Sequence, residues 1–349
     1  MGGRNAVQLF YIISGFLISY VLVERRSYRT LRGFYINRYL RLYPVYGVVA
    51  VATLAFFAAE ALRYHGPPVE FFAIYRAAPP AADALLLVSN LFLLGQDWVM
   101  FSAVEHHSFV LGTDFTQSEI PLWQGLIAPQ AWTLGVELTF YLVAPFILTR
   151  RAAIYSVLIL SIALRAYFVY IGLGRRDPWT YRFFPTELAL FLIGALAHQI
   201  LLPWYRRILK DRISIAASIG TYVLVAMSFC YFLVPIREIY KEAALFGSFI
   251  LVLPLTFIFQ NGHSRDGAIG DLSYPIYIGH VLAIWVTSAA LDAIRDATHL
   301  DSPLLTASCC VTASLVFALV LNSYIAAPFE RVRARFRSQS SPALDRQAS

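Results

Sequence analysis

Two ionisable side chains, Glu137 and His280, lie in otherwise apolar stretches of the sequence and could take part in proton transfer. Glu137 is in the stretch 132–148, and His280 is in the stretch 272–292. An ionisable group among apolar neighbours is costly to bury and is therefore a candidate for function. Histidine suits this role because it gains and loses its proton near neutral pH. A buried histidine held by structural hydrogen bonds, or a glutamate that reaches nearby water, is the alternative for each residue.

Two arginines three residues apart, Arg38 and Arg41, could bind phosphate groups. Three residues bring side chains to the same face of a helix, and guanidinium groups form paired hydrogen bonds to phosphate. The surrounding sequence FYINRYLRLYPVY, residues 34–46, also fits a positively charged loop with a belt of interfacial tyrosines. Pro44 is expected to end the helix that carries the two arginines.

A third feature is the pair Ser14 and Gly15 within the apolar stretch 6–23. A serine followed by glycine allows two helices to approach closely and leaves a hydroxyl for hydrogen bonding. Helix packing alone would explain this pair.

The composition indicates which elements position these residues. Of the 349 residues, 58% are apolar and 14% are charged, against about 45–50% and 25% in a soluble domain. The apolar residues form blocks long enough to cross a hydrocarbon core of about 30 Å, without the alternation of a barrel strand. We therefore predict an all-α, polytopic transmembrane helical bundle with about nine spans. The predicted spans are 6–23, 43–62, 132–148, 152–172, 184–202, 213–234, 243–259, 272–292 and 304–326.

A shorter apolar stretch, 84–95, contains Asn90 and is predicted to be a re-entrant or interfacial helix within a long outer segment. Counting 1.5 Å per residue, Glu137 should lie roughly 7 Å below the outer membrane edge and His280 about 12 Å from the cytoplasmic edge.

The distribution of Lys and Arg predicts the orientation of the bundle. The loops 24–42 and 203–212 and the chain end are rich in Arg, whereas 98–131 contains no Lys or Arg. Because cytoplasmic loops retain positive charge, the C-terminus should be cytoplasmic and the N-terminus outside. We predict a membrane domain over 1–331 and a basic, disordered cytoplasmic tail over 332–349. This topology accounts for the excess of Arg, so nucleic acid is not expected as a partner. The three cysteines lie within predicted spans and indicate no metal site.

Four motifs, in order along residues 10–280, resemble those of the acyltransferase-3 family of membrane O-acyltransferases. The family's Phe-Phe-x-x-Ser-Gly-Phe-Leu-Ile helix, Arg-x-x-Arg-x-x-Pro-x-Tyr segment, Trp-Ser-Leu-x-x-Glu-x-x-Phe-Tyr helix and Ser-Tyr-x-x-Tyr-x-x-His helix are similar to FYIISGFLI, RYLRLYPVY, WTLGVELTFY and SYPIYIGH here. Thr133 replaces the common serine, and Leu138 stands where a second acid often follows. Family members have about ten spans and begin with a helix carrying Arg and, about ten residues on, a catalytic His. The orientation, which places Met1 outside, likewise leads us to expect such a helix before residue 1.

The resemblance implies an enzyme that transfers an acyl group, usually acetyl, from cytosolic acyl-CoA to a hydroxyl of an envelope or exported carbohydrate. Acyl-CoA would be a co-substrate rather than a bound cofactor, and the protein would lie in the bacterial cytoplasmic (inner) membrane. His280 and Glu137 become catalytic candidates, Arg38 and Arg41 candidates for the CoA phosphates, and Ser14 and Gly15 would shape a passage between the two faces. The remaining substrate-binding candidates are the aromatic residues of the motifs: Trp132, Tyr141, Tyr274 and Tyr277.

Two other functions fit the same observations. A transporter or flippase of a lipid-linked sugar would also need many spans and a few buried polar residues, although matching broken helices in two halves are not visible. A catalytically inactive, truncated homologue acting as a partner is the second. Transfer from labelled acyl-CoA would distinguish the enzyme from both.

Overall fold

The computed structural model describes residues 2–64, 70–112, 114–174, 176–261, 264–298 and 302–337, and most of these are helical. Seven helical stretches among them are long and apolar enough to cross a membrane. These stretches are Gly3–Glu24, Leu31–Arg63, Arg151–Tyr170, Phe184–Cys230, Glu238–Gln260, Gly270–Ala293 and Pro303–Ala334. The predicted class, an all-α polytopic membrane protein, is therefore confirmed.

The number of spans differs from the predicted nine for two reasons. The stretch Phe184–Cys230 is 47 residues long and contains both predicted spans 184–202 and 213–234. Helix α5, Trp132–Ile147, has only 16 residues, which gives about 24 Å at 1.5 Å per residue. It is thus shorter than a hydrocarbon core of about 30 Å.

The chain forms two compact units. Unit 1 contains residues 1–35, 139–267 and 337–349, and unit 2 contains residues 36–138 and 268–336. Three helices, α2 (Leu31–Tyr64), α5 and α11 (Ser264–Thr298), contain residues of both units.

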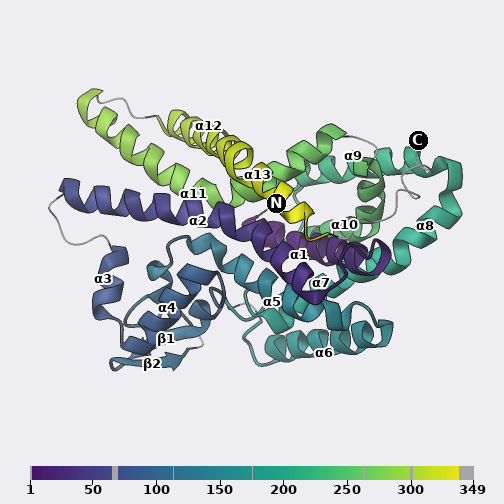
Figure 1. The fold of residues 1–349 in the computed structure, drawn as a ribbon, viewed down its shortest axis with the longest axis horizontal. Coiled ribbons are helices and arrows are strands. Elements are labelled where there is room, and N and C mark those ends of the chain that lie inside the picture. The colour runs from purple at the N-terminus through teal and green to yellow at the C-terminus, as the bar shows by residue number, and fades with distance from the viewer. Residues whose placement is uncertain are drawn as a thin grey trace. The chain divides into compact units, whose positions relative to one another are not determined.

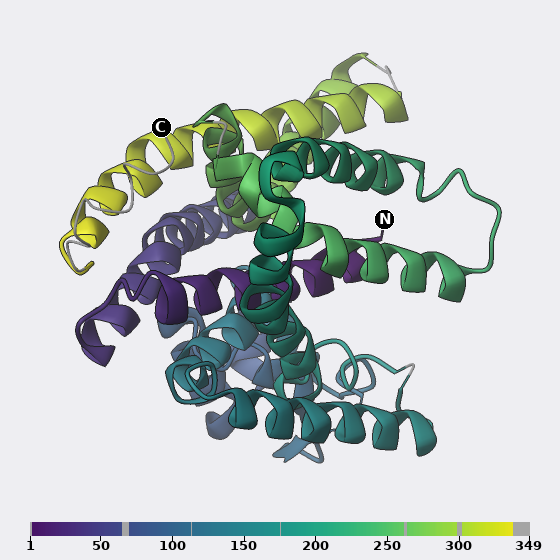
Figure 2. The same cartoon turned by 90° about the vertical axis from the view of Figure 1, so that its right-hand side faces the viewer.

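Unit 1 is centred on the packing of α1 (Gly3–Ser19) against α7 (Phe184–Leu196). Each of these helices ends in a π-helical turn, η1 (Tyr20–Glu24) after α1 and η5 (Ala197–Leu201) after α7. Helix α6 (Arg151–Tyr170) packs against α7, and Figure 2 shows α9 (Ile213–Cys230) running beside α10 (Glu238–Asn261). Between η5 and α9 lie α8 (Leu202–Leu209) and the short turn η6 (Lys210–Arg212).

Unit 2 contains most of α2 and α11 (Ser264–Thr298), together with α12 (Pro303–Leu321). Helix α12 continues through η7 (Asn322–Ala326) into α13 (Ala327–Ala334). Below α2 in Figure 1 lie α3 (Glu70–Ala77), α4 (Pro80–Phe92) and a β-hairpin. The connections within this group include the short helical turns η2 (Trp98–Phe101), η3 (Leu122–Gly125) and η4 (Pro129–Ala131).

Helix α2 continues through Pro44, so the predicted helix end at this proline is wrong. The Tyr274 hydroxyl donates a hydrogen bond to the Leu42 carbonyl, at 2.5 Å, and also interacts with the backbone of Tyr46. Pro44 lacks the N–H that would bond to the Leu40 carbonyl, and Tyr274 bonds to the helix backbone on both sides of the proline, at Leu42 and Tyr46.

The hairpin pairs β1 (Ser102–Glu105) with β2 (Ser108–Leu111) in antiparallel register, Ser102 opposite Leu111. The turn residues His106 and His107 have φ of 48° and 60°, as in a two-residue turn that matches the twist of the strands. This hairpin is not predicted from the sequence, because neither histidine is a typical residue for such a turn.

Asn90 is buried at the end of α4, in the stretch predicted as a re-entrant or interfacial helix. Its amide nitrogen donates to the Gly125 carbonyl at 2.8 Å, and its carbonyl oxygen accepts from the Ile127 backbone N–H at 3.0 Å. With 13 residues, α4 is about 20 Å long, too short to span a bilayer. Asn90 therefore joins α4 to the loop that leads into α5.

At the other end of the chain, the predicted tail 332–349 begins within α13, which extends to Ala334. The segment 338–349 lies outside the described residues.

Candidate functional site

Tyr274 connects three of the predicted motifs within unit 2. It lies on α11, bonds to the backbone of α2, and interacts electrostatically with the side chains of Arg41, Tyr46 and Glu137. The Arg-x-x-Arg segment, the glutamate helix and the histidine helix therefore converge at this tyrosine.

The helix that carries Glu137 is bonded to α11 at its first turn. The Thr133 hydroxyl donates to the Tyr277 hydroxyl at 2.8 Å, and Tyr277 is about 8 Å along α11 from Leu272 at 1.5 Å per residue. The first turn of α5 therefore meets α11 inside the predicted span 272–292. The depth of Glu137 in the membrane stays a prediction.

Tyr277 fixes the start of α5 against α11. Its hydroxyl donates to the Gln130 carbonyl at 2.7 Å, and the Gln130 side-chain amide donates to the Ile278 carbonyl at 2.7 Å. Trp132, the first residue of α5, is two residues after Gln130 and is buried. The hydrogen bonds at Gln130 fix the position of α5, and therefore of Glu137, along α11.

His280 has one of its two ring nitrogens fixed by the protein. Nδ1 lies 2.8 Å from the Tyr277 carbonyl oxygen, and because a carbonyl only accepts hydrogen bonds, Nδ1 must carry the proton. In the neutral ring, Nε2 is then the basic nitrogen. Among the described residues no hydrogen bond to Nε2 is present. A histidine held in this way can act as a general base.

The two arginines on α2 differ in environment. Arg38 is buried, with 5% of its surface exposed, whereas Arg41 is exposed. Next to Arg38, the Asn37 amide donates to the Arg333 carbonyl at 2.8 Å, and Arg333 donates back to the Asn37 carbonyl at 3.2 Å. Arg41 is therefore better placed to meet a ligand from water, and Arg38 lies where α2 meets α13.

Asp97 is a buried carboxyl in unit 2 that the sequence analysis did not select. A β-carbon on Gly135 of α5 would lie 2.6 Å from Asp97 Oδ1, and that oxygen has no hydrogen-bond partner among the described residues. Burial raises the pKa of Asp97 from 3.8 to about 7, although backbone N–H groups at Asp97 and Trp98 partly oppose this shift. The glycine in the WTLGVE motif thus makes room for a carboxyl group.

The other predicted site residues, Ser14, Gly15 and Tyr141, belong to unit 1. A β-carbon on Gly15 would lie 1.8 Å from the Phe191 carbonyl oxygen, so this glycine is required for close packing of α1 on α7. Tyr141 is buried with its ring 6.3 Å from that of Phe34. Close helix packing explains the glycine at position 15. Packing against another aromatic ring explains the tyrosine at position 141.

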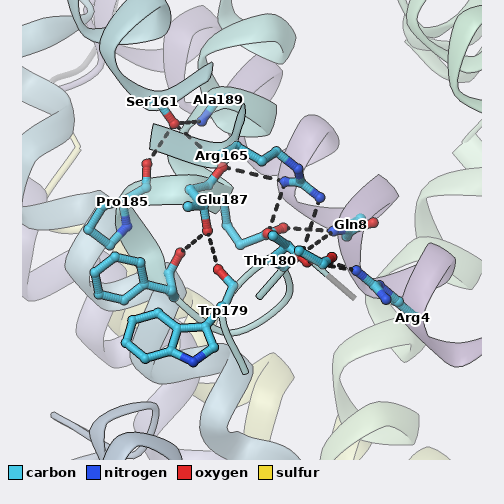
Figure 3. A network of polar contacts seen from close by, with 12 residues as sticks. Arg4, Gln8, Ser161, Arg165, Trp179, Thr180, Pro185, Glu187 and Ala189 are labelled. Atoms are coloured by element: carbon cyan, nitrogen blue, oxygen red, sulfur yellow. Dashed lines mark hydrogen bonds and ion pairs between the residues drawn. The ribbon is translucent and has the colours of Figure 1, made fainter. Parts of the chain in front are cut away.

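Unit 1 contains a polar network where α1 begins (Figure 3). Arg165 Nη1 lies 3.0 Å from Glu187 Oε1, and Glu187 Oε2 accepts from the Gln8 amide at 3.0 Å. The Thr180 carbonyl accepts from Arg165, Gln8 and Arg4. The network joins α1, α6, α7 and the loop before α7.

A pocket of about 470 Å³ adjoins this network and is called the Arg4 pocket below. It is lined by Arg4, Asn5, Gln8, Arg165, Gly174, Leu190, Ile239, Glu242, Ala243 and Phe246.

A second polar chain lies where η1 ends, and the sequence analysis missed it. Ser19 Oγ is 3.0 Å from His198 Nδ1, and His198 Nε2 is 3.0 Å from Glu24 Oε2. Arg206 and Gln199 complete the chain by donating to Glu24 Oε1 and Ser19 Oγ. The available signal is His198, an ionisable residue in the apolar stretch 184–202, and its side chain is only 2% exposed.

This chain borders a smaller pocket of about 250 Å³, the His198 pocket, lined by Val23, Glu24, Leu148, Thr149, Arg151, His198, Gln199 and Pro203. Asn5 of the Arg4 pocket and Glu24 of the His198 pocket lie near opposite ends of the same helical stretch, Gly3–Glu24. At 1.5 Å per residue they are about 28 Å apart, close to the thickness of a hydrocarbon core. The two pockets thus lie at opposite ends of unit 1.

The fold and these sites define a helical membrane protein with polar, ionisable groups enclosed among its membrane-crossing helices. The chain belongs to the acyltransferase-3 family, since that family's model, described as an acyltransferase domain, matches residues 1–323. It is therefore a membrane acyltransferase by family.

A relative from Aquifex aeolicus (strain VF5), described as an uncharacterized protein, is 27% identical over 178 residues. The match covers 48% of this chain and 75% of the relative. No solved structure matches this chain.

Proposed function

We propose that this protein transfers an acyl group, acetyl in the first instance, from cytosolic acyl-CoA to a hydroxyl of an envelope or exported carbohydrate. Membership of the acyltransferase-3 family supports acyl transfer. The distribution of Lys and Arg supports a cytoplasmic C-terminus, and the family supports a location in the bacterial cytoplasmic membrane. Donor, acceptor and location rest on the resemblance and on this charge distribution.

The observation that carries the mechanism is the hydrogen bond from His280 Nδ1 to the Tyr277 carbonyl. It leaves Nε2 to take the proton of the acceptor hydroxyl as its oxygen attacks the thioester carbonyl carbon. The C–O bond forms, the C–S bond breaks, and the CoA thiolate leaves and takes up a proton. Glu137 is proposed to position the reacting groups. It interacts electrostatically with Tyr274, and Tyr274 lies on the same helix as His280.

The donor is proposed to approach through Arg41 and Arg38, whose guanidinium groups would pair with the phosphates of CoA. The electrostatic contact between Arg41 and Tyr274 supports a short path from such a phosphate site to the histidine helix. In this arrangement Trp132, Tyr274 and Tyr277 line the route of the acyl chain.

The test uses the full chain in lipid vesicles with acetyl-CoA labelled on the acetyl group. We expect CoA release and label on carbohydrate in wild type, and loss of both in His280→Ala without loss of folded protein. A normal turnover in His280→Ala would remove this residue from the site. A protein that moves a lipid-linked sugar across the membrane without consuming acetyl-CoA would be a flippase instead.

A further inference from the structure

The Arg4 pocket has the size and position of a ligand site at the end of unit 1 where α1 begins. Its volume of about 470 Å³ falls in the range of about 300–1,000 Å³ for small-molecule sites, whereas the His198 pocket is smaller. The charge distribution assigns this end of unit 1 to the outer face, because the N-terminus is placed outside. A ligand here would thus come from the side opposite the cytosolic donor.

The walls of the pocket are chemically divided. Arg4, Asn5, Gln8 and Arg165 supply amide and guanidinium groups from α1 and α6, and Glu242 of α10 supplies a carboxylate. The apolar wall consists of Leu190, Ile239, Ala243 and Phe246. Polar groups that both donate and accept, facing an apolar wall, suit a ligand with many hydroxyls and exposed C–H surface.

The charges of the pocket balance, which favours an uncharged ligand. Arg165 is paired with Glu187, whose side chain is fully buried behind the wall. The remaining pair of opposite charges is Arg4 and Glu242. Glu242 forms no hydrogen bond or ion pair with the residues that the structure describes. Its carboxylate can therefore accept from ligand hydroxyls, for which carboxylates are strong acceptors.

The polar wall is held rigidly in place. The Thr180 carbonyl accepts from Arg4, Gln8 and Arg165 at 3.3, 3.3 and 3.1 Å (Figure 3). The Asn5 amide donates to the Tyr231 hydroxyl at 3.2 Å, and Tyr231 donates to Glu238. Binding groups that are already ordered lose little freedom when a ligand arrives, which favours specific recognition.

We propose that the Arg4 pocket binds the carbohydrate acceptor, with Arg4 and Glu242 bonding to its hydroxyls and Phe246 packing on its C–H surface. This inference rests on the proposed function, because it names the place where that reaction's acceptor enters.

The experiment fills the pocket with a large side chain and makes the same substitution at a neighbouring residue outside the pocket as the control. Ala243→Trp puts a large ring into the pocket, whereas Ala244→Trp adds the same ring at an exposed residue of the same helix that does not line it. Each full-length variant is assayed in vesicles with labelled acetyl-CoA and an oligosaccharide fraction released from the envelope of the producing cells. We expect Ala243→Trp to raise the KM for oligosaccharide by about tenfold or more while the KM for acetyl-CoA stays unchanged. Ala244→Trp should behave as wild type.

A second pair of variants keeps the test decisive if Ala243→Trp does not fold. Arg4→Gln should raise the KM for oligosaccharide, whereas Arg237→Gln, an exposed arginine that does not line the pocket, should leave it unchanged. An unchanged KM for oligosaccharide in folded pocket variants, or a raised KM for acetyl-CoA, would overturn the acceptor assignment while transfer by wild type continues. Absence of transfer in wild type would instead refute the proposed function, and the acceptor assignment with it.

Discussion

The carbonyl oxygen of Phe191 on α7 occupies the space where Gly15 on α1 would carry a side chain, 1.8 Å from a β-carbon built there. The relation is reciprocal, because a β-carbon on Gly194 of α7 would lie 1.9 Å from the Ile12 carbonyl oxygen of α1. The backbones of α1 and α7 are thus in direct contact at two places, one at each glycine. Packing, one of two explanations for the Ser-Gly pair, accounts for its glycine.

Gly15→Ala should destabilise unit 1 strongly, since neither backbone can move aside without separating α1 from α7. Overpacking of this kind lowers the free energy of unfolding by about 1–3 kcal/mol. Thermal unfolding in detergent would measure the effect. Gly247→Ala on α10 is the control, because a β-carbon there meets nothing within 4 Å. Equal melting temperatures for the two variants would contradict the packing interpretation.

Arg165→Met should destabilise the protein more than the double variant Arg165→Met with Glu187→Met. The single change leaves Glu187, whose side chain is fully buried, without its 3.0 Å ion-pair partner. Removing one member of a buried pair costs about 3–5 kcal/mol, whereas replacing both by apolar residues is often neutral. Unfolding of the variants in detergent would show this order, and the reverse order would mean that the pair contributes little.

Asp97→Asn should remove a pH dependence of stability from unit 2. Burial raises the pKa of Asp97 from 3.8 to about 7, so between these values the unfolded chain has released a proton that the folded chain keeps. The free energy of unfolding should therefore fall as pH rises from about 4 to about 7 and level off above. At about 1.4 kcal/mol per pKa unit, the loss is at most about 4 kcal/mol.

Melting temperatures of wild type and Asp97→Asn across this range would test it, with the exposed Glu105→Gln as control. A wild-type curve parallel to that of Asp97→Asn would show that this carboxyl does not titrate in the window.

Ser19→Ala should retain acyl transfer, although Ser19, His198 and Glu24 are bonded in the order of a nucleophile, base and acid. Ser19 has no exposed surface and does not line the His198 pocket, so an acyl donor has no access to its oxygen. Losing a catalytic nucleophile reduces turnover on the order of 10⁶-fold. Steady-state rates with labelled acetyl-CoA would detect a loss of that size, which would make Ser19 the site of a covalent intermediate.

Arg41→Ala should weaken the use of acetyl-CoA more than it lowers the amount of protein in the membrane. The guanidinium is exposed and interacts with Tyr274, so its loss removes charge from the proposed donor path without opening a cavity. Arg38→Ala should also impair acetyl-CoA use, but with a further loss of folded protein, because Arg38 is buried. The KM for acetyl-CoA and the protein amount by immunoblot separate the two effects. An equal loss of both in Arg41→Ala would return this residue to a role in topology.

The sequence by itself determined the class of the protein and most of its helices. Long apolar blocks cannot be exposed to water, and only helices satisfy their own backbone hydrogen bonds in lipid. Block length alone therefore predicts spans at 6–23 and 243–259, where the structure has the helical stretches Gly3–Glu24 and Glu238–Gln260. The four motifs are likewise short segments that can be recognised in the sequence alone, and their order predicted the family.

Only the tertiary structure decided how these helices meet. Helix α2 passes through Pro44, and Tyr274, 230 positions later in the sequence, bonds to the backbone of this helix at Leu42. Glu137 interacts with the same Tyr274, and His198 pairs with Glu24 across 174 residues. Such contacts depend on the packing of distant segments, which hydropathy and local spacing do not encode, whereas the length of an apolar block is a local property of the sequence.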